Sequence, residues 1–540
     1  MSRNNNKKIR SFLLEAPRQP EHVAHWSSGE KTPIHTLRRQ PVNLHEILQC
    51  KKKVVMDWRE DETLVYVTPP TSHDRPPYNQ RCLLFDYGND KSSVPRLYIV
   101  GKTDDAIAKT AAYFMALEEP WQHQKSSTLL RIQGMHSYPV LNLSAARTHS
   151  LQHMLEAIPS RTIHFVNVQL RPEQSKILAT RRHRISLILS RCLLEDGGMT
   201  FVNALHKRST PFGSLTFTES DDEVTPYSWK FNAFSCVIQA TTIDTLRLPQ
   251  LNDISASIPF WREAGSLHYE ITTMTLMKLG IPSLLIFIDK LALTIYHNDD
   301  DDDDDNDGDT FPTECMLLFW RRVMELSHFK ELQIRVKLSA SDTVIAAPKS
   351  VVQEMIYAVQ ANRDLQIWDV CDRESSEVDW DLHMGTILEG IEDHPGLREI
   401  KTFVRHRERA FGPNLAQIQK LITHNQQIVV KDDVGNILSN GRVMDELYSL
   451  NHFYRGSKVL AKPPFMQKQL RVERPSFVAT ALMLLRNFQR TALLLSDHTD
   501  VLCELLQHAI MDGDDDTTSP PSSRNWIWQR TKQWLGRARK

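Results

Sequence analysis

The stretch "IDTLRL", Ile243 to Leu248, places leucines at alternate positions, Leu246 and Leu248. An alternation of this kind is typical of a β-strand with one buried face. Because neighbouring strand residues point to opposite faces, the leucines are expected to enter a core and Arg247 to lie on the other face. The stretch "FKELQI", Phe329 to Ile334, has nearly the same pattern. The same kind of strand therefore occurs in separate parts of the chain.

Similar strands recur from about residue 150 onward, and an amphipathic helical stretch such as "MTFVNALHKR" or "ECMLLFWRRVMELS" precedes most of them. The first apolar residues of the expected strands are Ile163, Ile185, Leu215, Leu246, Leu267, Leu291, Leu332, Leu365 and Leu397. Their separations are 22, 30, 31, 21, 24, 41, 33 and 32 residues. Most of these values are typical of a solenoid in which one strand and one helix make each repeat.

The longest separation, from Leu291 to Leu332, contains the acidic run Asp299 to Asp309. Removing those eleven residues reduces the separation of 41 to 30. The run is therefore predicted to be an insertion in the loop of one repeat, where added residues cost little loop-closure entropy and disturb no core.

Polar residues alternate with the core positions of these strands. In a stacked array their side chains would line one continuous concave surface, which we expect to bind a partner. The predicted surface residues are His164, Arg247, His268, Gln333, Gln366 and Arg398.

Longer phrases, such as "HPGLREIKTF", "YSLNHFYRGSKVL" and "NFQRTALLLSDHTDVLCELL", add to the pattern. With the strands, they give the chain a resemblance to leucine-rich-repeat proteins of the ribonuclease-inhibitor-like class. At a finer level the chain resembles leucine-rich-repeat-like proteins predicted from diatom genomes. The resemblance covers roughly residues 150 to 510. It implies an α/β solenoid and a binding role, although the Asn or Cys that normally follows the strand is mostly absent here.

The expected organisation has four parts. Residues 1–90 are polar and Pro-rich and are predicted to form a partly disordered arm. Residues 91–435 are predicted to form the solenoid, with 299–309 as its acidic loop insertion. Residues 436–510 are expected to be a helical C-terminal cap, which an open repeat array requires. Residues 511–540 would be an acidic linker followed by a basic, Trp-rich tail.

Composition excludes several functional classes. The chain has 65 Lys and Arg against 66 Asp and Glu, so its overall charge does not favour nucleic acid as a partner. The seven cysteines form no CxxC pair with metal-ligand spacing and are typical of reduced thiols. We therefore expect an intracellular protein in the cytoplasm or the nucleus, without a cofactor or a structural metal. The tail "NWIWQRTKQWLGRARK" could contact a membrane or a partner's groove, or fold back over the chain's own apolar surface.

Two motifs indicate alternatives. Gly101-Lys102-Thr103 after "RLYIV" resembles half of a phosphate-binding loop, but Arg96 stands where that motif needs glycine. Asp303, Asp305, Asp307, Gly308 and Glu314 fit a calcium-loop spacing, but Pro312 interrupts it and no helix is expected before it. A turn capped by Thr103 and a solvated acidic loop are the competing interpretations.

A third group, Ser496, His498 and Asp500, contains the residue types of a catalytic triad. These neighbours at one helix start would point in different directions and would not converge. The sequence therefore predicts a non-enzymatic scaffold that binds a protein, with a nucleotide-dependent switch or enzyme at Gly101 and a calcium-responsive binder as its rivals.

Overall fold

The computed structural model describes residues 13–17, 33–48, 53–68, 81–87, 96–117, 129–135, 140–218, 229–251, 255–297, 311–338, 345–370, 378–449 and 451. The chain divides into two compact units, residues 1–379 and 380–540. The division lies inside the predicted segment 91–435, so the expected solenoid is not one compact unit.

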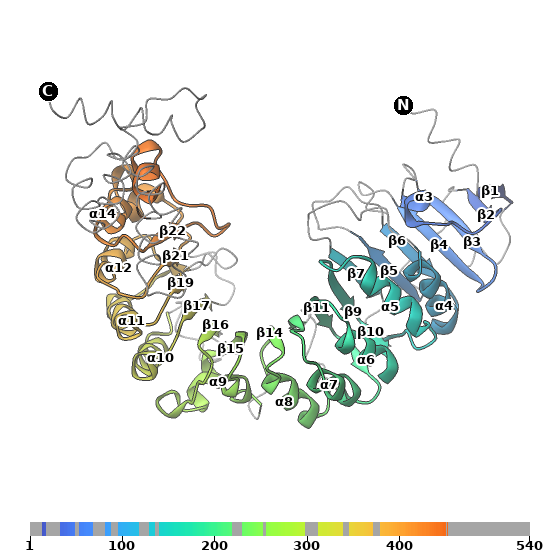
Figure 1. Ribbon diagram of the computed structural model, residues 1–540, viewed down its shortest axis with the longest axis horizontal. Helices are drawn as coiled ribbons and strands as arrows, with labels where there is room; N and C mark the ends of the chain where they lie inside the picture. Colours follow the sequence, from blue (N-terminus) through green and yellow to red (C-terminus); the bar gives the residue numbers. More distant parts are fainter. Residues whose placement is uncertain are drawn as a thin grey trace, which may run out of the picture. The chain divides into compact units, whose positions relative to one another are not determined.

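Parallel strands dominate the first unit (Figure 1). Nine of these strands pair in parallel, each with the one before it in the following list, so their order in the sheet is their order in the chain. They are β7 (Leu129–Gly134), β9 (Thr162–Val166), β11 (Ile185–Ser190), β13 (Gly213–Thr218), β14 (Ile243–Leu248), β15 (Ser266–Thr272), β16 (Lys290–His297), β17 (Glu331–Leu338) and β19 (Ile367–Asp369). The predicted α/β class is confirmed.

Helices connect these strands and lie on one side of them (Figure 1). They are α5 (Thr148–Ala157), α6 (Pro172–Thr180), α7 (Met199–His206), α8 (Phe231–Gln239), α9 (Thr273–Lys278), α10 (Thr313–Leu326) and α11 (Lys349–Ala361). Each buries one apolar face; α7, for example, buries Phe201 and Leu205, and the Phe201 ring meets Phe212 edge-on with centroids 6.0 Å apart. This packing buries one face of each strand against the helices, which the period-two pattern predicts.

The strand register follows the predicted spacing through the centre of the sheet. Leu215, Leu246, Leu267, Leu291 and Leu332 form one row of directly paired, buried residues. The separation of 41 between Leu291 and Leu332 thus does not disturb the pairing. The acidic run falls between the end of β16 and the start of α10, where the insertion was predicted, and lies outside the described residues.

Two strand positions differ from the prediction. Ile163 pairs with Leu187 and not with Ile185, although both Ile185 and Leu187 face the core. Leu365 is buried but precedes β19, and Trp368 takes the position opposite Leu332. The turn after α11, in which the Leu365 amide donates to the Asn362 carbonyl at 2.9 Å, lets Leu365 enter the core before the strand begins.

Ordered strands also occur within residues 1–90, so the described part of that range is not the partly disordered arm that the sequence predicted. The strands are β1 (Leu13–Ala16), β2 (Ile34–Leu37), β3 (Val54–Trp58), β4 (Thr63–Thr68) and β5 (Cys82–Asp86), followed by β6 (Arg96–Val100). All neighbouring pairs are antiparallel except β2 with β3, and β5 joins them to β7. Strand β4 is buried on both faces, which removes the alternation that the sequence pattern relied on.

Helices α3 (Leu44–Leu48) and α4 (Asp104–Met115) accompany these strands. Smaller pairings join β8 (Leu141–Asn142), β10 (Val168–Leu170) and β12 (Leu193–Leu194), and also β18 (Ile345–Ala346) with β20 (Val378–Asp379). Short 3-10 turns η1 (Ile258–Trp261) and η2 (Ile281–Ser283) connect the central strands. In the part of the chain that the structure describes, no helix is long and apolar enough to cross a membrane.

Arginines link the ends of neighbouring helices in the first unit. The last carbonyls of a helix have no partner within the helix and need donors from elsewhere. The guanidinium of Arg208 donates to the carbonyls of Ala179 and Arg181 at the end of α6. Arg262 donates to the carbonyls of Ile238 and Ala240 at the end of α8, at 2.7 and 3.3 Å. These long side chains therefore fasten one strand–helix unit to the next.

The second unit repeats the alternation on a smaller scale. It contains α12 (Met384–Gly390), β21 (Glu399–Lys401), α13 (Arg407–Phe411), η3 (Pro413–Leu415), α14 (Ala416–His424) and β22 (Val429–Lys431), and β21 pairs in parallel with β22. The buried carboxylate of Asp381 accepts from the amides of Arg405 and His406 before α13. Most of the expected cap 436–510, and all of 511–540, lie outside the described residues.

Candidate functional site

The candidate site is the sheet face of the first unit that points away from the helices. Along β15, β16 and β17 every second residue is buried, and the residues between them are partly exposed. Parallel pairing arranges these partly exposed residues in transverse rows. The central row consists of Arg131, His164, Ile188, Thr216, Arg247, His268, Ala292, Gln333 and Asp369.

Four of the predicted surface residues, His164, Arg247, His268 and Gln333, lie in this central row. The other two do not. Gln366 is exposed but precedes β19, and its backbone amide donates to the Lys330 carbonyl at 2.8 Å. Arg398 is exposed, precedes β21 and belongs to the second unit. The prediction that these two residues face outward from a strand was wrong. The buried residues of the two strands, Trp368 and Ile400, come three residues after Leu365 and Leu397, the leucines that were expected there.

Hydroxyl groups predominate on β11 and β13. Ser214 donates to Ser186 at 2.8 Å, and on the next strands Ser266 donates to Thr245 at 3.0 Å. Ser190 lies within hydrogen-bond distance of Thr218 on the neighbouring strand. The side chains on this part of the face are mostly short and uncharged. A partner would therefore meet hydrogen-bonding groups here and not charges.

His164 and Ser190 form the one serine–histidine contact that this face presents among the described residues. The His164 Nε2 lies 2.7 Å from the Ser190 Oγ, and the Arg131 Nε donates to the His164 Nδ1 at 3.3 Å. Since Nδ1 of a neutral imidazole accepts this bond, Nε2 must carry the proton and donate to Ser190. A general base would have to accept the serine proton at Nε2, so this pair is in the wrong tautomer for nucleophilic catalysis.

Charged side chains occur on this face from β14 to β19. Lys290 pairs with Glu331 at 2.5 Å, and the Gln333 amide donates to Asp369 at 2.7 Å. Tyr296 donates to Glu270 at 3.2 Å, while the Lys337 ammonium lies 5.3 Å from the centroid of the Tyr296 ring. These contacts between neighbouring strands orient the side chains before any partner arrives, which lowers the entropy cost of binding.

His268 lies between cations on this charged half. Burial lowers the pKa of its imidazole to about 4, and the positive charges of Arg247 and Arg335 add to the effect. Burial and the charge of Arg131 likewise lower the pKa of His164 to about 4. Both imidazoles are therefore neutral at pH 7, and the region around His268 carries positive potential from the two arginines.

The sequence did not single out Ser190, Thr218, Arg131, Arg335 or Asp369. Arg335 lies two residues after Gln333, and continuing the alternation along β17 would have found it. Asp369 could not be found in this way, because the register of β19 differs from the spacing in the sequence.

The alternative motifs have local explanations or lie outside the described residues. Thr103 is the N-cap of α4, and its side chain accepts from the Ala106 amide at 3.2 Å, as the competing interpretation predicted. Glu314 is exposed in the first turn of α10, whereas Asp303, Asp305, Asp307 and Gly308 are not among the described residues. The same holds for Ser496, His498 and Asp500 and for the Trp-rich tail. Within the described ranges, no three His, Cys, Asp or Glu side chains could hold a metal ion together.

No protein-family model matches the chain, and no curated protein or solved structure matches it.

Proposed function

We propose that the chain is a non-enzymatic interaction protein of the cell interior. Its strand–helix units would form a degenerate leucine-rich-repeat-like solenoid. The face that contains the central row would bind a protein partner. The transverse register carries this proposal, because it brings side chains from nine successive parallel strands into one row away from the helices.

The chemistry of the face favours a folded protein over a small ligand. Its hydroxyl half and its charged half extend over many strands, and broad contacts with dispersed polar groups are typical of protein interfaces. Arginine is enriched at interaction hot spots, and Arg247 is an exposed arginine in the central row. We expect an acidic side chain of the partner to meet Arg247 and the neutral imidazole of His268.

Site-specific photocrosslinking tests the proposal. A benzophenone amino acid at Thr216 or Gln333 should give discrete crosslinked products in native lysate. The same amino acid at Asn232 on α8 or Gln353 on α11, both exposed on helices, should not give those products. Equal crosslinking from strands and helices would contradict a partner-specific face.

A charge reversal identifies the contact. Arg247→Glu should reduce the yield of the crosslinked partner at least tenfold, because it places a like charge opposite the expected acidic group. Arg363→Glu, at an exposed arginine after α11, is the matched control and should leave the yield unchanged. An unchanged yield with Arg247→Glu would contradict the proposed role of Arg247.

A further inference from the structure

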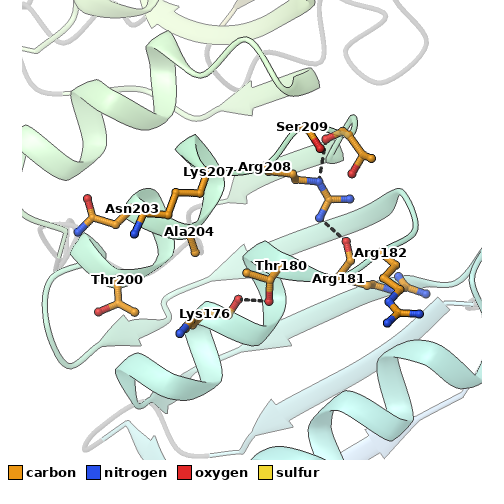
Figure 2. Close-up of a pocket in the computed structure, with 11 residues that line it drawn as sticks. Lys176, Thr180, Arg181, Arg182, Thr200, Asn203, Ala204, Lys207, Arg208 and Ser209 are labelled. Atoms are coloured by element: carbon orange, nitrogen blue, oxygen red, sulfur yellow. Dashed lines mark hydrogen bonds between the residues drawn. The ribbon is translucent and has the colours of Figure 1, made fainter.

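A groove of about 510 Å³ lies between α6 and α7 on the helix side of the first unit (Figure 2). Cavities of this size accommodate small-molecule ligands. Five of its lining residues are cationic: Lys176, Arg181, Arg182, Lys207 and Arg208. The other lining residues are Ala204 and side chains with hydroxyl or amide groups, and none of the lining residues is acidic.

Arg208 is a fixed part of the groove. Its Nη1 donates to the Ala179 carbonyl at 3.0 Å and to the Arg181 carbonyl, and its Nη2 donates to the His183 carbonyl at 3.2 Å. Its Nε donates to the Thr210 carbonyl at 2.8 Å. The guanidinium is thus held by hydrogen bonds to backbone carbonyls, and its positive charge lies beside the groove.

Arg181 is a buried cation with unused donors. The residue is only 4% exposed, and its Nη2 donates to the Ile158 carbonyl at 3.2 Å. Its Nε and Nη1 are buried and find no hydrogen-bond partner among the described residues. Burial lowers the pKa of Arg181; Glu156 opposes this shift, and the charges of Arg161 and Arg208 add to it. An anion in the groove would reduce this repulsion between cations.

Lys176 and Lys207 are exposed and lie towards one end of the groove, near Asn203, whereas the three arginines lie towards the other end (Figure 2). Within the described part of the chain, neither lysine pairs with a carboxylate, whereas Lys290, Lys330 and Lys420 do. Two separated groups of cations suit a ligand with more than one anionic group.

Within their own bounds, the two neighbouring helices add no exposed cation to this surface. The exposed positions of α5 are Thr148, His149, Gln152, His153 and Glu156, and those of α8 are Phe231, Asn232 and Gln239. Neither set contains lysine or arginine. An extended nucleic acid would need a longer basic track, so the localised charge favours a small ligand.

We propose that the groove between α6 and α7 binds a small ligand that carries two or more phosphate groups. Arg181 and Arg208 hold fixed positive charge at one end, and Arg182 adds a third cation there. Lys176 and Lys207 close on the ligand from facing walls, and Thr200 and Asn203 supply neutral hydrogen bonds. The ligand could be soluble or the headgroup of a phosphorylated lipid, since both present the same chemistry.

Calorimetric titration of the full chain with inorganic triphosphate tests the proposal. We expect one-to-one binding that weakens as salt rises. The double variant Lys176→Gln/Lys207→Gln should raise the Kd at least tenfold, and both residues are exposed, so the fold should not suffer. Lys349→Gln, at an exposed lysine of α11, should leave the Kd unchanged. Heat without defined stoichiometry, or equal Kd values for the double variant and the wild type, would overturn the proposal.

Two further arms identify the source of the phosphates. Co-sedimentation with vesicles of phosphatidylcholine and phosphatidylinositol bisphosphate, displaced by triphosphate, would assign a lipid headgroup. Binding of inositol hexakisphosphate without co-sedimentation would assign a soluble ligand. If triphosphate does not bind and a phosphopeptide or single-stranded RNA binds with the same dependence on Lys176 and Lys207, the small-ligand proposal is wrong.

Discussion

Leu291 lies directly opposite Leu332 on the neighbouring parallel strand, although the acidic run stands between them in the chain. The run follows β16 and precedes α10, so it interrupts neither element. Deleting Asp299–Asp309 should therefore change the free energy of unfolding by less than about 1 kcal/mol, because shortening the connection between β16 and α10 alters only a small closure entropy. Urea denaturation measures this. A matched Leu291→Ala variant should lose about 2–5 kcal/mol, and similar losses in both variants would show that the run contributes to the packed structure.

The calcium alternative has its own test. The acidic run with Glu314 has the spacing of a calcium loop, but Glu314 occupies the first turn of a helix that begins after Pro312. We expect calorimetric titration with calcium at millimolar concentration to give no stoichiometric heat. One-to-one heat that disappears with Glu314→Gln would instead favour a calcium-responsive binder.

Arg262 should be a major determinant of stability. It is 1% exposed, and its guanidinium donates to carbonyls of Ile238, Ala240 and Ile243. Replacing it with methionine leaves these carbonyls without their donor, so Arg262→Met should lower the free energy of unfolding by about 3 kcal/mol. Arg262→Lys should restore only part of this loss, because an ammonium cannot reproduce the planar fork. Urea denaturation curves that superimpose on the wild type would contradict the role assigned to Arg262.

Thr103 should act through helix capping and not through nucleotide binding. Thr103→Ala removes the acceptor for the Ala106 amide and should cost about 1 kcal/mol of stability. Lys102→Ala, at an exposed neighbour, should cost much less. Titration with labelled ATP and GTP checks the rival directly: saturable micromolar binding that Lys102→Ala abolishes would support a nucleotide-dependent switch.

The two buried imidazoles predict a pH dependence of stability. The folded state holds the pKa of His164 and of His268 at about 4, below the ordinary value of 6.5. Between these values the unfolded chain binds protons that the folded chain does not, so stability falls as pH drops from about 6.5 to 4 and no further below it. Over this pH range, each histidine should lower the free energy of unfolding by about 2 kcal/mol. This value is smaller than the full pKa shift would give, because both side chains are partly exposed.

The variant His164→Gln/His268→Gln provides the comparison. Subtracting its unfolding free energy from that of the wild type across this pH range isolates the contribution of the two groups. The difference should decline towards acid pH. A difference that stays constant would mean that neither imidazole resists protonation in the folded protein.

Predictions from the sequence succeeded where a residue's environment depends on its nearest neighbours in the strand. Alternation placed Leu246 in the core and Arg247 on the opposite face, and spacing paired Leu215 with Leu246. The same reasoning failed at Gln366, because a buried Leu365 in a turn looks identical to the first core residue of a strand. It also failed over residues 1–90, since strands buried on both faces lack a two-residue period.

By itself, the sequence determined the α/β alternation, the position of the acidic run and the face on which His164, Arg247, His268 and Gln333 lie. These features follow from local periodicity and from where a chain tolerates insertion. Only the tertiary structure decided that Arg208 reaches the end of α6, that His164 donates to Ser190, and that Lys176 and Lys207 share a groove. Each of these arrangements joins residues from different strand–helix units, and their approach depends on the register and packing of whole units, which no local pattern encodes.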